Sequence, residues 1–541
     1  MKIFNDIKLK KIVQVIFFMF LPLCDLFRNV GTGEEMMLAT QGIGLIIAVI
    51  LITHYGLRSF LKFYNLIWVG FGIGGIYVIS KIYANLKYSE YYQRECWLIC
   101  VNFCLLGMIV TKIVIDSIKA KENYLKKIKA FFVVNNLPFF LWLGYILIAT
   151  LTRENIYRPG CELIYFGLFF LVSYSEDELH DLYNNFLNGV LIGFWILQGY
   201  AFLRRPWVDT ITRYRGLYFN SNIYDIICLL VMLILLVKMT NARREKTIKN
   251  WQYYFWLLQY GMVFSLIIIS VGRFSVVLAF VGTIVYGIVV AILERDTFKN
   301  IILHGVLCIL CVSIMLPFTS ACASYLPRIA KSPVSFQNEY FLWGDLNDSD
   351  NYVSMNEFIE YSLGRLSTLI TNYEIKVPTD ENGNVVNDQD VIDERPLDPD
   401  WQEKTYFLDE ENYNSVDLRV AIGLTYLVEL NMWGHTTDEW WLWVAPHEPQ
   451  IHPHNIFIME AFVYGIPAGI LFIAYIISCF AGSVRGLKYS NKKYQLFLVF
   501  AVMQVVSFGI FEMNWQPGQI SWFTLLFITK FLLQTKDEKD I

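Results

Sequence analysis

Histidine is concentrated in one short stretch of this chain. Four of the seven histidines lie between His435 and His454, and the last two belong to the run His452-Pro-His454-Asn455, directly before a long apolar segment. Imidazole is the side chain that gains and loses a proton near neutral pH, so such a cluster is typical of acid–base or metal chemistry. The place of the run, where a polar segment meets an apolar one, predicts an enzyme that works at a membrane face.

Arginine gathers at two other places. The connection 204–222 carries Arg204, Arg205, Arg213 and Arg215, and Arg273 lies between two later apolar segments. Guanidinium binds phosphate oxygens in a planar fork and keeps its charge in a partly dry site, whereas lysine is the usual residue for simple loop charge. These arginines therefore indicate an anionic ligand. Pairing with lipid phosphates is the alternative, and we favour it for Arg204 and Arg205.

The composition defines the elements that must position these residues. With 55% hydrophobic and 16% aromatic residues over 541 positions, the chain has more apolar surface than one soluble core can bury. A bilayer core takes about 20 helical residues, and the apolar runs here are long and unalternating. We therefore expect an all-α polytopic integral membrane protein with about fourteen transmembrane helices. They are expected at residues 12–30, 36–55, 64–83, 97–116, 130–152, 162–175, 184–203, 223–240, 252–271, 274–293, 300–318, 455–482, 495–511 and 519–534.

The charges of the short connections set the expected orientation. Lysine and arginine cluster before the first span and in alternate connections after it, and such loops resist translocation. Both termini are therefore expected on the cytoplasmic side of the cell membrane, with the first span as an uncleaved signal anchor. The connection 176–183 is the exception, because it has four acidic residues and no lysine or arginine. The hairpin 162–203 is therefore either a pair of spans or a re-entrant loop.

One segment differs from the rest and divides the chain. Residues 319–453 hold seven Lys and Arg against 24 Asp and Glu, a net charge of −17. We expect them to form a large extracytoplasmic loop between an N-terminal transmembrane bundle of about eleven spans, 1–318, and about three C-terminal spans, 454–541. Residues 377–417 within the loop are acidic, polar and weakly periodic, which is typical of a solvated surface insertion.

An amphipathic helix is expected after the acidic insert, lying on the membrane or capping a cavity. Arg419 and Glu429 fall off its apolar stripe, with Arg419 toward the polar edge. The stripe comprises Val416, Val420, Leu424, Leu427 and Val428.

Three motifs resemble those of a known family. They are residues 213–222, Arg-Tyr-Arg-Gly-Leu-Tyr-Phe-Asn-Ser-Asn, then 272–275, Gly-Arg-Phe-Ser, then 452–455, His-Pro-His-Asn. In order and spacing they are similar to those of the O-antigen ligase and O-antigen polymerase family of bacterial surface-polysaccharide assembly. The resemblance covers roughly residues 205–480. Gly272 stands where the family usually has Ser, and the acidic insert is unusually large.

The resemblance implies a GT-C-like membrane glycosyltransferase. Such an enzyme moves a glycan from an undecaprenyl diphosphate carrier to an acceptor hydroxyl at the outer face of the cytoplasmic membrane. Polymerisation of repeat units and ligation to another anchor use the same chemistry, with no nucleotide sugar, and we expect no metal or other cofactor. The expected partners are the lipid-linked oligosaccharide, a glycan or lipid-anchored acceptor and membrane lipids, alongside a flippase and a chain-length regulator, and no nucleic acid.

The resemblance and the residue types together assign the site. His454 is expected to take the acceptor proton as general base, a step typically worth about 10² to 10⁴ in rate, and Asn455 to orient the imidazole or a sugar hydroxyl. Arginines are expected to hold the diphosphate and offset charge on the leaving oxygen. These arginines are Arg213, Arg215, Arg273 and Arg419. Asn220, Asn222 and His452 are expected to contact the substrate.

Two alternatives compete with this interpretation. A Zn²⁺ or Mn²⁺ site would use the clustered histidines and nearby carboxylates, although His-x-His on an undefined turn has no committed metal spacing. A flippase or other transporter of lipid-linked oligosaccharide would also be polytopic, but transporters usually carry charges within spans and inverted repeats. The charges here gather at the outer face, which favours the enzyme. The residues of the metal alternative are His435, His447, His452, His454, Asp438, Glu439 and Glu448.

Overall fold

The computed structural model describes most of the chain outside the acidic insert. The described residues are 7–30, 33–56, 59–86, 90–120, 137–153, 162–204, 214–218, 220–244, 250–270, 272–295, 298–330, 359, 364, 399, 406–408, 415–436, 439–450, 452–487, 495–510, 512 and 518–534. Arg213 and most of residues 377–417 lie outside them, so the predictions made for these residues stay predictions.

The described elements are helices and one short hairpin. They follow as α1 (Ile7–Met19), α2 (Leu21–Val30), α3 (Gly33–Tyr55), α4 (Asn65–Leu86), α5 (Glu90–Ala120), α7 (Leu137–Thr152), α8 (Glu162–Leu171), α9 (Glu176–Arg204), α10 (Ser221–Arg244), α11 (Asn250–Ser270), α12 (Arg273–Glu294), α13 (Phe298–Ile329), α16 (Ser415–Val428), β1 (Leu442–Ala445), β2 (Glu448–Gln450), α17 (Ile456–Tyr464), α18 (Ile466–Leu487), α19 (Gln495–Gly509) and α20 (Ile520–Gln534). The strands β1 and β2 pair antiparallel.

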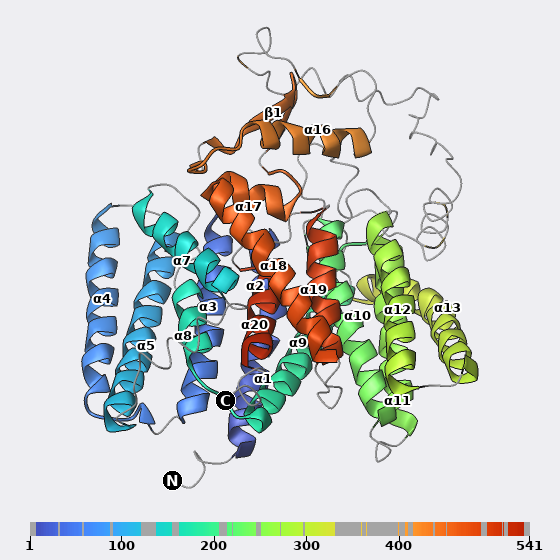
Figure 1. Cartoon of the computed structure of the whole chain (residues 1–541), viewed down its shortest axis with the longest axis horizontal. Helices are drawn as coiled ribbons and strands as arrows, with labels where there is room; N and C mark the ends of the chain where they lie inside the picture. Colours follow the sequence, from blue (N-terminus) through green and yellow to red (C-terminus); the bar gives the residue numbers. More distant parts are fainter. Residues whose placement is uncertain are drawn as a thin grey trace.

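The prediction of an all-α membrane protein is confirmed. Nine helices in the described part are long and apolar enough to cross a membrane, and α7, α8, α19 and α20 are shorter apolar helices. The long helices stand side by side, with α16 and β1 across one end of them (Figure 1). α10 is buried along most of its length, whereas few residues in the apolar windows of α4 and α13 are buried. Each of the fourteen expected spans contains a helix, while their number as complete crossings stays a prediction.

Two of the expected spans are broken helices. The first divides into α1 and α2 at Phe20, and the twelfth divides into α17 and α18 at Gly465. Gly465 has φ +101°, and a Cβ on it would approach Met432 O to 2.4 Å. A Cβ on Gly434 would likewise approach the backbone of α17 to 2.2 Å. Only glycine permits such close backbone contact. The chain after α16 therefore packs directly against the break between α17 and α18.

The helix expected after the acidic insert is α16, and it is apolar on two faces. Ala421, Ile422 and Tyr426 are buried. The Tyr426 hydroxyl donates hydrogen bonds to the carbonyl oxygens of Trp440 and Gln450, at 2.8 and 3.0 Å. The stripe predicted from the sequence points outward instead, since Val420, Leu424, Leu427 and Val428 are exposed. The inner face therefore fixes α16 to the hairpin β1–β2 and to α17.

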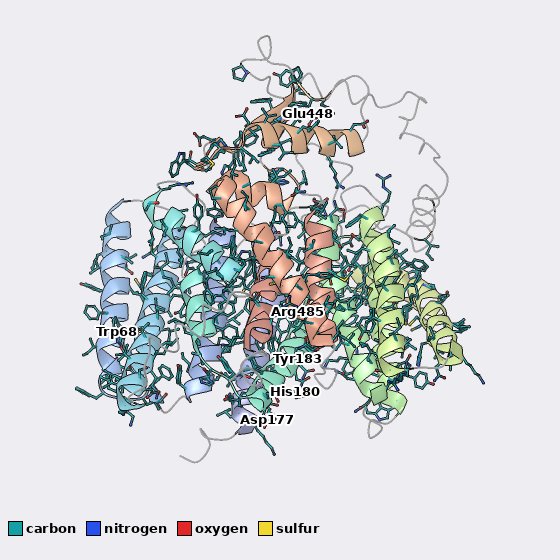
Figure 2. The ribbon with its side chains drawn as sticks, viewed as in Figure 1. Trp68, Asp177, His180, Tyr183, Glu448 and Arg485 are labelled. Carbon is teal, nitrogen blue, oxygen red and sulfur yellow. The ribbon has the colours of Figure 1, made fainter. Side chains whose placement is uncertain are left out.

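The acidic residues predicted to lie in a connection form the first turns of α9, and lysines of α1 neutralise them. Glu178 accepts from Lys10 Nζ at 2.8 Å, and Asp181 pairs with Lys11 at 2.8 Å. Figure 2 labels Asp177, His180 and Tyr183 near the end of the molecule opposite α16. The acidic residues thus lie at the same end of the molecule as the basic start of the chain, and its lysines balance their negative charge.

The first prediction concerns the two ends of the helical layer. Exposed Glu429 follows α16, and exposed Arg295 follows α12 at the opposite end. If the Arg295 end is cytoplasmic, as expected from the basic connections, Glu429→Cys should react with an impermeant thiol reagent in intact cells. Arg295→Cys should react only after permeabilisation. Labelling in the reverse order would invert the orientation.

Candidate active site

The site is organised around Glu512, an acidic residue between α19 and α20. Its side chain is only 8% exposed, and Oε1 accepts from Arg419 Nη2 at 2.6 Å and from Asn222 Nδ2 at 2.7 Å. Its other oxygen, Oε2, lies 3.2 Å from Nδ1 of His454. Residues from α10, α16 and the turn before α17 therefore meet on one buried carboxylate.

The environment of Glu512 keeps it ionised. Burial opposes the charge, but the hydrogen bond and charge of His454, the charge of Arg419 and the Asn222 amide outweigh it and hold the pKa of this carboxyl below its usual value. An ionised carboxylate can only accept hydrogen bonds. The Nδ1 atom of His454 must therefore donate in either charge state of the ring, and in the neutral imidazole this leaves the lone pair on Nε2.

The backbone around His454 directs its ring to Glu512. His454 has φ +47°, a left-handed conformation that is uncommon for residues other than glycine. Asn455 next to it caps α17, since its Oδ1 accepts from the N–H groups of Phe457 and Ile458 at 3.0 and 3.1 Å. Its Nδ2 donates to Ile510 O at 3.2 Å, two residues before Glu512. Asn455 thus joins the two segments that carry the His–Glu pair.

His452 packs against His454 but differs from it in environment. The two rings meet edge to face with centroids 4.3 Å apart. Burial, and next the neighbouring His454, lower the pKa of His452 to about 4. His452 is therefore neutral at neutral pH and supplies a ring face beside His454.

A second buried carboxylate fixes the segment that contains Arg215. Asp25 of α2 accepts from the Tyr218 hydroxyl at 3.0 Å and from the N–H of Ile520, the first residue of α20, at 2.8 Å. Tyr214 N donates to Ile269 O at the end of α11, and Arg215 itself is buried. The segment 214–218 is thus held against α2, α11 and the start of α20.

Arg273 begins α12 and is exposed. A Cβ on the preceding Gly272 would lie 2.0 Å from the carboxylate of Asp225, which accounts for glycine where the resembling family usually has serine. Phe274 touches Phe508 of α19, with ring centroids 5.8 Å apart. Arg273 therefore starts a helix that packs beside the residues leading to Glu512.

The structure brings some of the predicted site residues together and separates others. Asn222, Arg419 and His454 share Glu512, and Asn220 Oδ1 accepts from the backbone N–H of Asn222 at the start of α10. His435 stacks on Phe462 instead, with centroids 4.1 Å apart. No group of three or more His, Cys, Asp or Glu placed to hold a metal ion occurs among the described residues.

Sequence reasoning missed both buried carboxylates. Glu512 had one available signal, because it is the one charged residue in the connection between the last two expected spans. Asp25 lies within the first expected span, where an acidic residue is expensive and usually has a function. Pairing these carboxylates with partners up to about 500 residues away in sequence needs the three-dimensional structure.

Comparison of the chain with protein-family profiles, curated proteins and solved structures gives no match. The assignment of a function therefore depends on the geometry around Glu512 and on the resemblance of the three motifs.

A double-mutant cycle should detect the Arg419–Glu512 pair. Arg419→Gln and Glu512→Gln should each destabilise the purified protein, but the double variant should lose less than the two losses added, by about 0.5–3 kcal/mol. Unfolding in detergent measures the coupling. The exposed pair Lys11–Asp181 is the control and should be nearly additive. Additive losses at Arg419 and Glu512 would contradict a coupled site.

The lowered pKa of His452 predicts a loss of stability toward acid. Between about pH 6.5 and about pH 4, the unfolded chain takes up a proton at His452 that the folded protein does not, so stability falls as pH falls through this window. His452→Gln should reduce the drop in apparent Tm between about pH 7 and about pH 5. Glu512 does not confound the test, because its pKa is lowered and its protonation reduces stability only at more acidic pH. An equal drop in both proteins would contradict the burial of a neutral His452.

Proposed function

We propose that this protein is a membrane glycosyltransferase of the O-antigen polymerase or ligase type. It would transfer a glycan from an undecaprenyl diphosphate carrier to an acceptor hydroxyl at the outer face of the cytoplasmic membrane. The observation that carries the proposal is the His454–Glu512 pair at the α16 end of the helices, joined there by Arg419 and Asn222. The motif resemblance and the apolar helices support it.

In the proposed reaction, His454 is the general base. The acceptor hydroxyl oxygen attacks C1 of the donor sugar, its proton passes to Nε2 of His454, and the bond from C1 to the diphosphate oxygen breaks. Glu512, bonded to Nδ1, stabilises the imidazolium that forms. The released polyprenyl diphosphate carries the electron pair of the broken bond.

Arginines counter the charge that develops on the leaving group. Arg273 is exposed at the start of α12, and Arg215 is buried in the segment held by Asp25. In the proposal these two, with Arg213, bind the diphosphate through planar forks. Arg419 forms a salt bridge with Glu512, so it holds the carboxylate in place and adds positive charge beside His454.

The remaining expectations form part of the same proposal. About fourteen spans with both termini in the cytoplasm would place α16 and the hairpin outside, over the site. A lipid-linked donor supplies the activated sugar, so no nucleotide sugar or metal is invoked. Asn455 is a positioning residue in this scheme, because its bonds go to the backbone of α17 and of Ile510.

The proposal predicts that His454→Ala abolishes glycan transfer. Lipid-linked repeat units should accumulate on the outer leaflet while protein level and membrane insertion stay normal, because Glu512 keeps Arg419 and Asn222 as partners when the imidazole is removed. Extraction of lipid-linked glycans from cells gives the measurement. His447→Ala, on the β1–β2 turn, is the control and should be tolerated. Precursor trapped on the cytoplasmic leaflet would instead indicate a flippase.

The arginines give a separate prediction. Arg273→Lys should keep the protein folded but remove most activity, because a compact ammonium cannot reproduce the bidentate fork. Arg204→Lys at the end of α9 should be mild by comparison. If Arg273→Lys makes normal glycan chains, Arg273 does not bind the diphosphate and is only a charge that faces the lipid.

A further inference from the structure

A cavity of about 480 Å³ lies far from the candidate active site, among α10, α11, α12 and α13. Its volume is typical of small-molecule sites, which are about 300–1,000 Å³. About 27 Å of helix separates Arg273, at the start of α12, from Ala291, which lines the cavity near the end of the same helix. Phe280, which also lines the cavity, lies about 10 Å along α12 from Arg273, so the cavity extends from the middle of the helices to the end opposite Arg273.

The cavity is apolar in its interior and polar at one end. Phe264, Phe280 and Val312 line it toward the middle of the helices. Toward the helix ends it is lined by Arg243, close to the end of α10, and by His304, close to the start of α13. These ends lie on the side opposite α16 (Figure 1).

Two polar pairs hold the helices together at that end. Arg243 Nη2 lies 3.1 Å from Glu294 Oε2, which joins α10 to α12. The Tyr253 hydroxyl lies 2.7 Å from His304 Nδ1, which joins α11 to α13. The exposed Arg295 and Lys299 stand on either side of the α12–α13 connection. Arg243 is the cation that lines the cavity, and in the sequence around this end Arg243, Arg295 and Lys299 stand against Glu294 and Asp296, a net charge of +1.

We propose that this cavity binds an anionic phospholipid of the leaflet opposite the candidate active site. One acyl chain would enter between α12 and α13, and the phosphate would lie at Arg243. An apolar channel that ends in excess cationic charge matches such a lipid, and basic pockets between transmembrane helices are typical sites for anionic headgroups. The proposal does not depend on the glycosyltransferase assignment.

Two glycines in the wall allow a direct test. A Cβ built on Gly287 of α12 or Gly305 of α13 meets no atom within 4 Å, so larger side chains can fill the cavity without a clash at the backbone. Gly282 of α12 also has open space but does not line the cavity. Gly287→Leu with Gly305→Leu is therefore the filling variant, and Gly282→Leu is its matched control.

The measurement is lipid binding to the purified full-length protein by native mass spectrometry. Phosphatidylglycerol and phosphatidylcholine with the same acyl chains are compared, and the wild type should prefer phosphatidylglycerol. The filling variant should lose the tightly bound lipid, and Gly282→Leu should keep it. Arg243→Gln should weaken the preference about fivefold, the effect of one cation beside a headgroup, whereas Arg485→Gln on α18 should not.

Several results would overturn the proposal. Equal binding of the two lipids by the wild type would remove the role of charge, and full retention by the filling variant would place the lipid elsewhere. If that variant keeps phosphatidylglycerol but uses a lipid-linked glycan donor less well, the cavity holds the carrier's chain instead. A matching loss from Gly282→Leu would mean that the effect is general destabilisation of α12.

Discussion

A buried, ionised carboxylate sets the arrangement of the α16 end of this protein. Removing a charge from water costs several kcal/mol unless it is paired and hydrogen-bonded. Glu512 meets this requirement through Arg419, Asn222 and His454, which come from α16, α10 and the turn before α17. Any conformation that separates one of these segments leaves a buried charge undercompensated. The pairing thus couples α16 to the bundle of long apolar helices.

The surrounding fold supports the same meeting point. The break at Gly465 and the close contact at Gly434 bring the chain after α16 against the junction of α17 and α18. Asn455 then caps α17 and reaches Ile510, so it joins the His454 turn to the Glu512 segment. Asp25 ties the segment after Arg215 to the start of α20. The functional side chains are therefore positioned by helix ends, whose backbone groups need partners in any case.

The sequence predicts the helices well because each apolar run carries its own signal. It also predicts His452 and His454 as a pair and places Asn222 and Arg419 in the site, and the structure brings these residues together. It does not predict the role of Glu512, since the one charged residue of a short connection does not reveal which distant residues it pairs with. The sequence also does not show which face of α16 packs inward, because apolar residues occur on both sides of the helix. The hydrogen bonds of Tyr426 to the hairpin identify the inner face. The two helix breaks did have a local signal, since Pro22 and Pro467 each follow a break by two residues.

The central claim is that His454, held by Glu512, removes a proton from an acceptor sugar on the outer side of the membrane. The most direct test is reconstitution of the purified protein in proteoliposomes with a lipid-linked oligosaccharide and its acceptor. The account predicts glycosylated acceptor and free polyprenyl diphosphate in equal amounts from the wild type, with neither product from Glu512→Ala or His454→Ala. Movement of intact lipid-linked oligosaccharide across the bilayer, with no glycosidic bond formed, would contradict it.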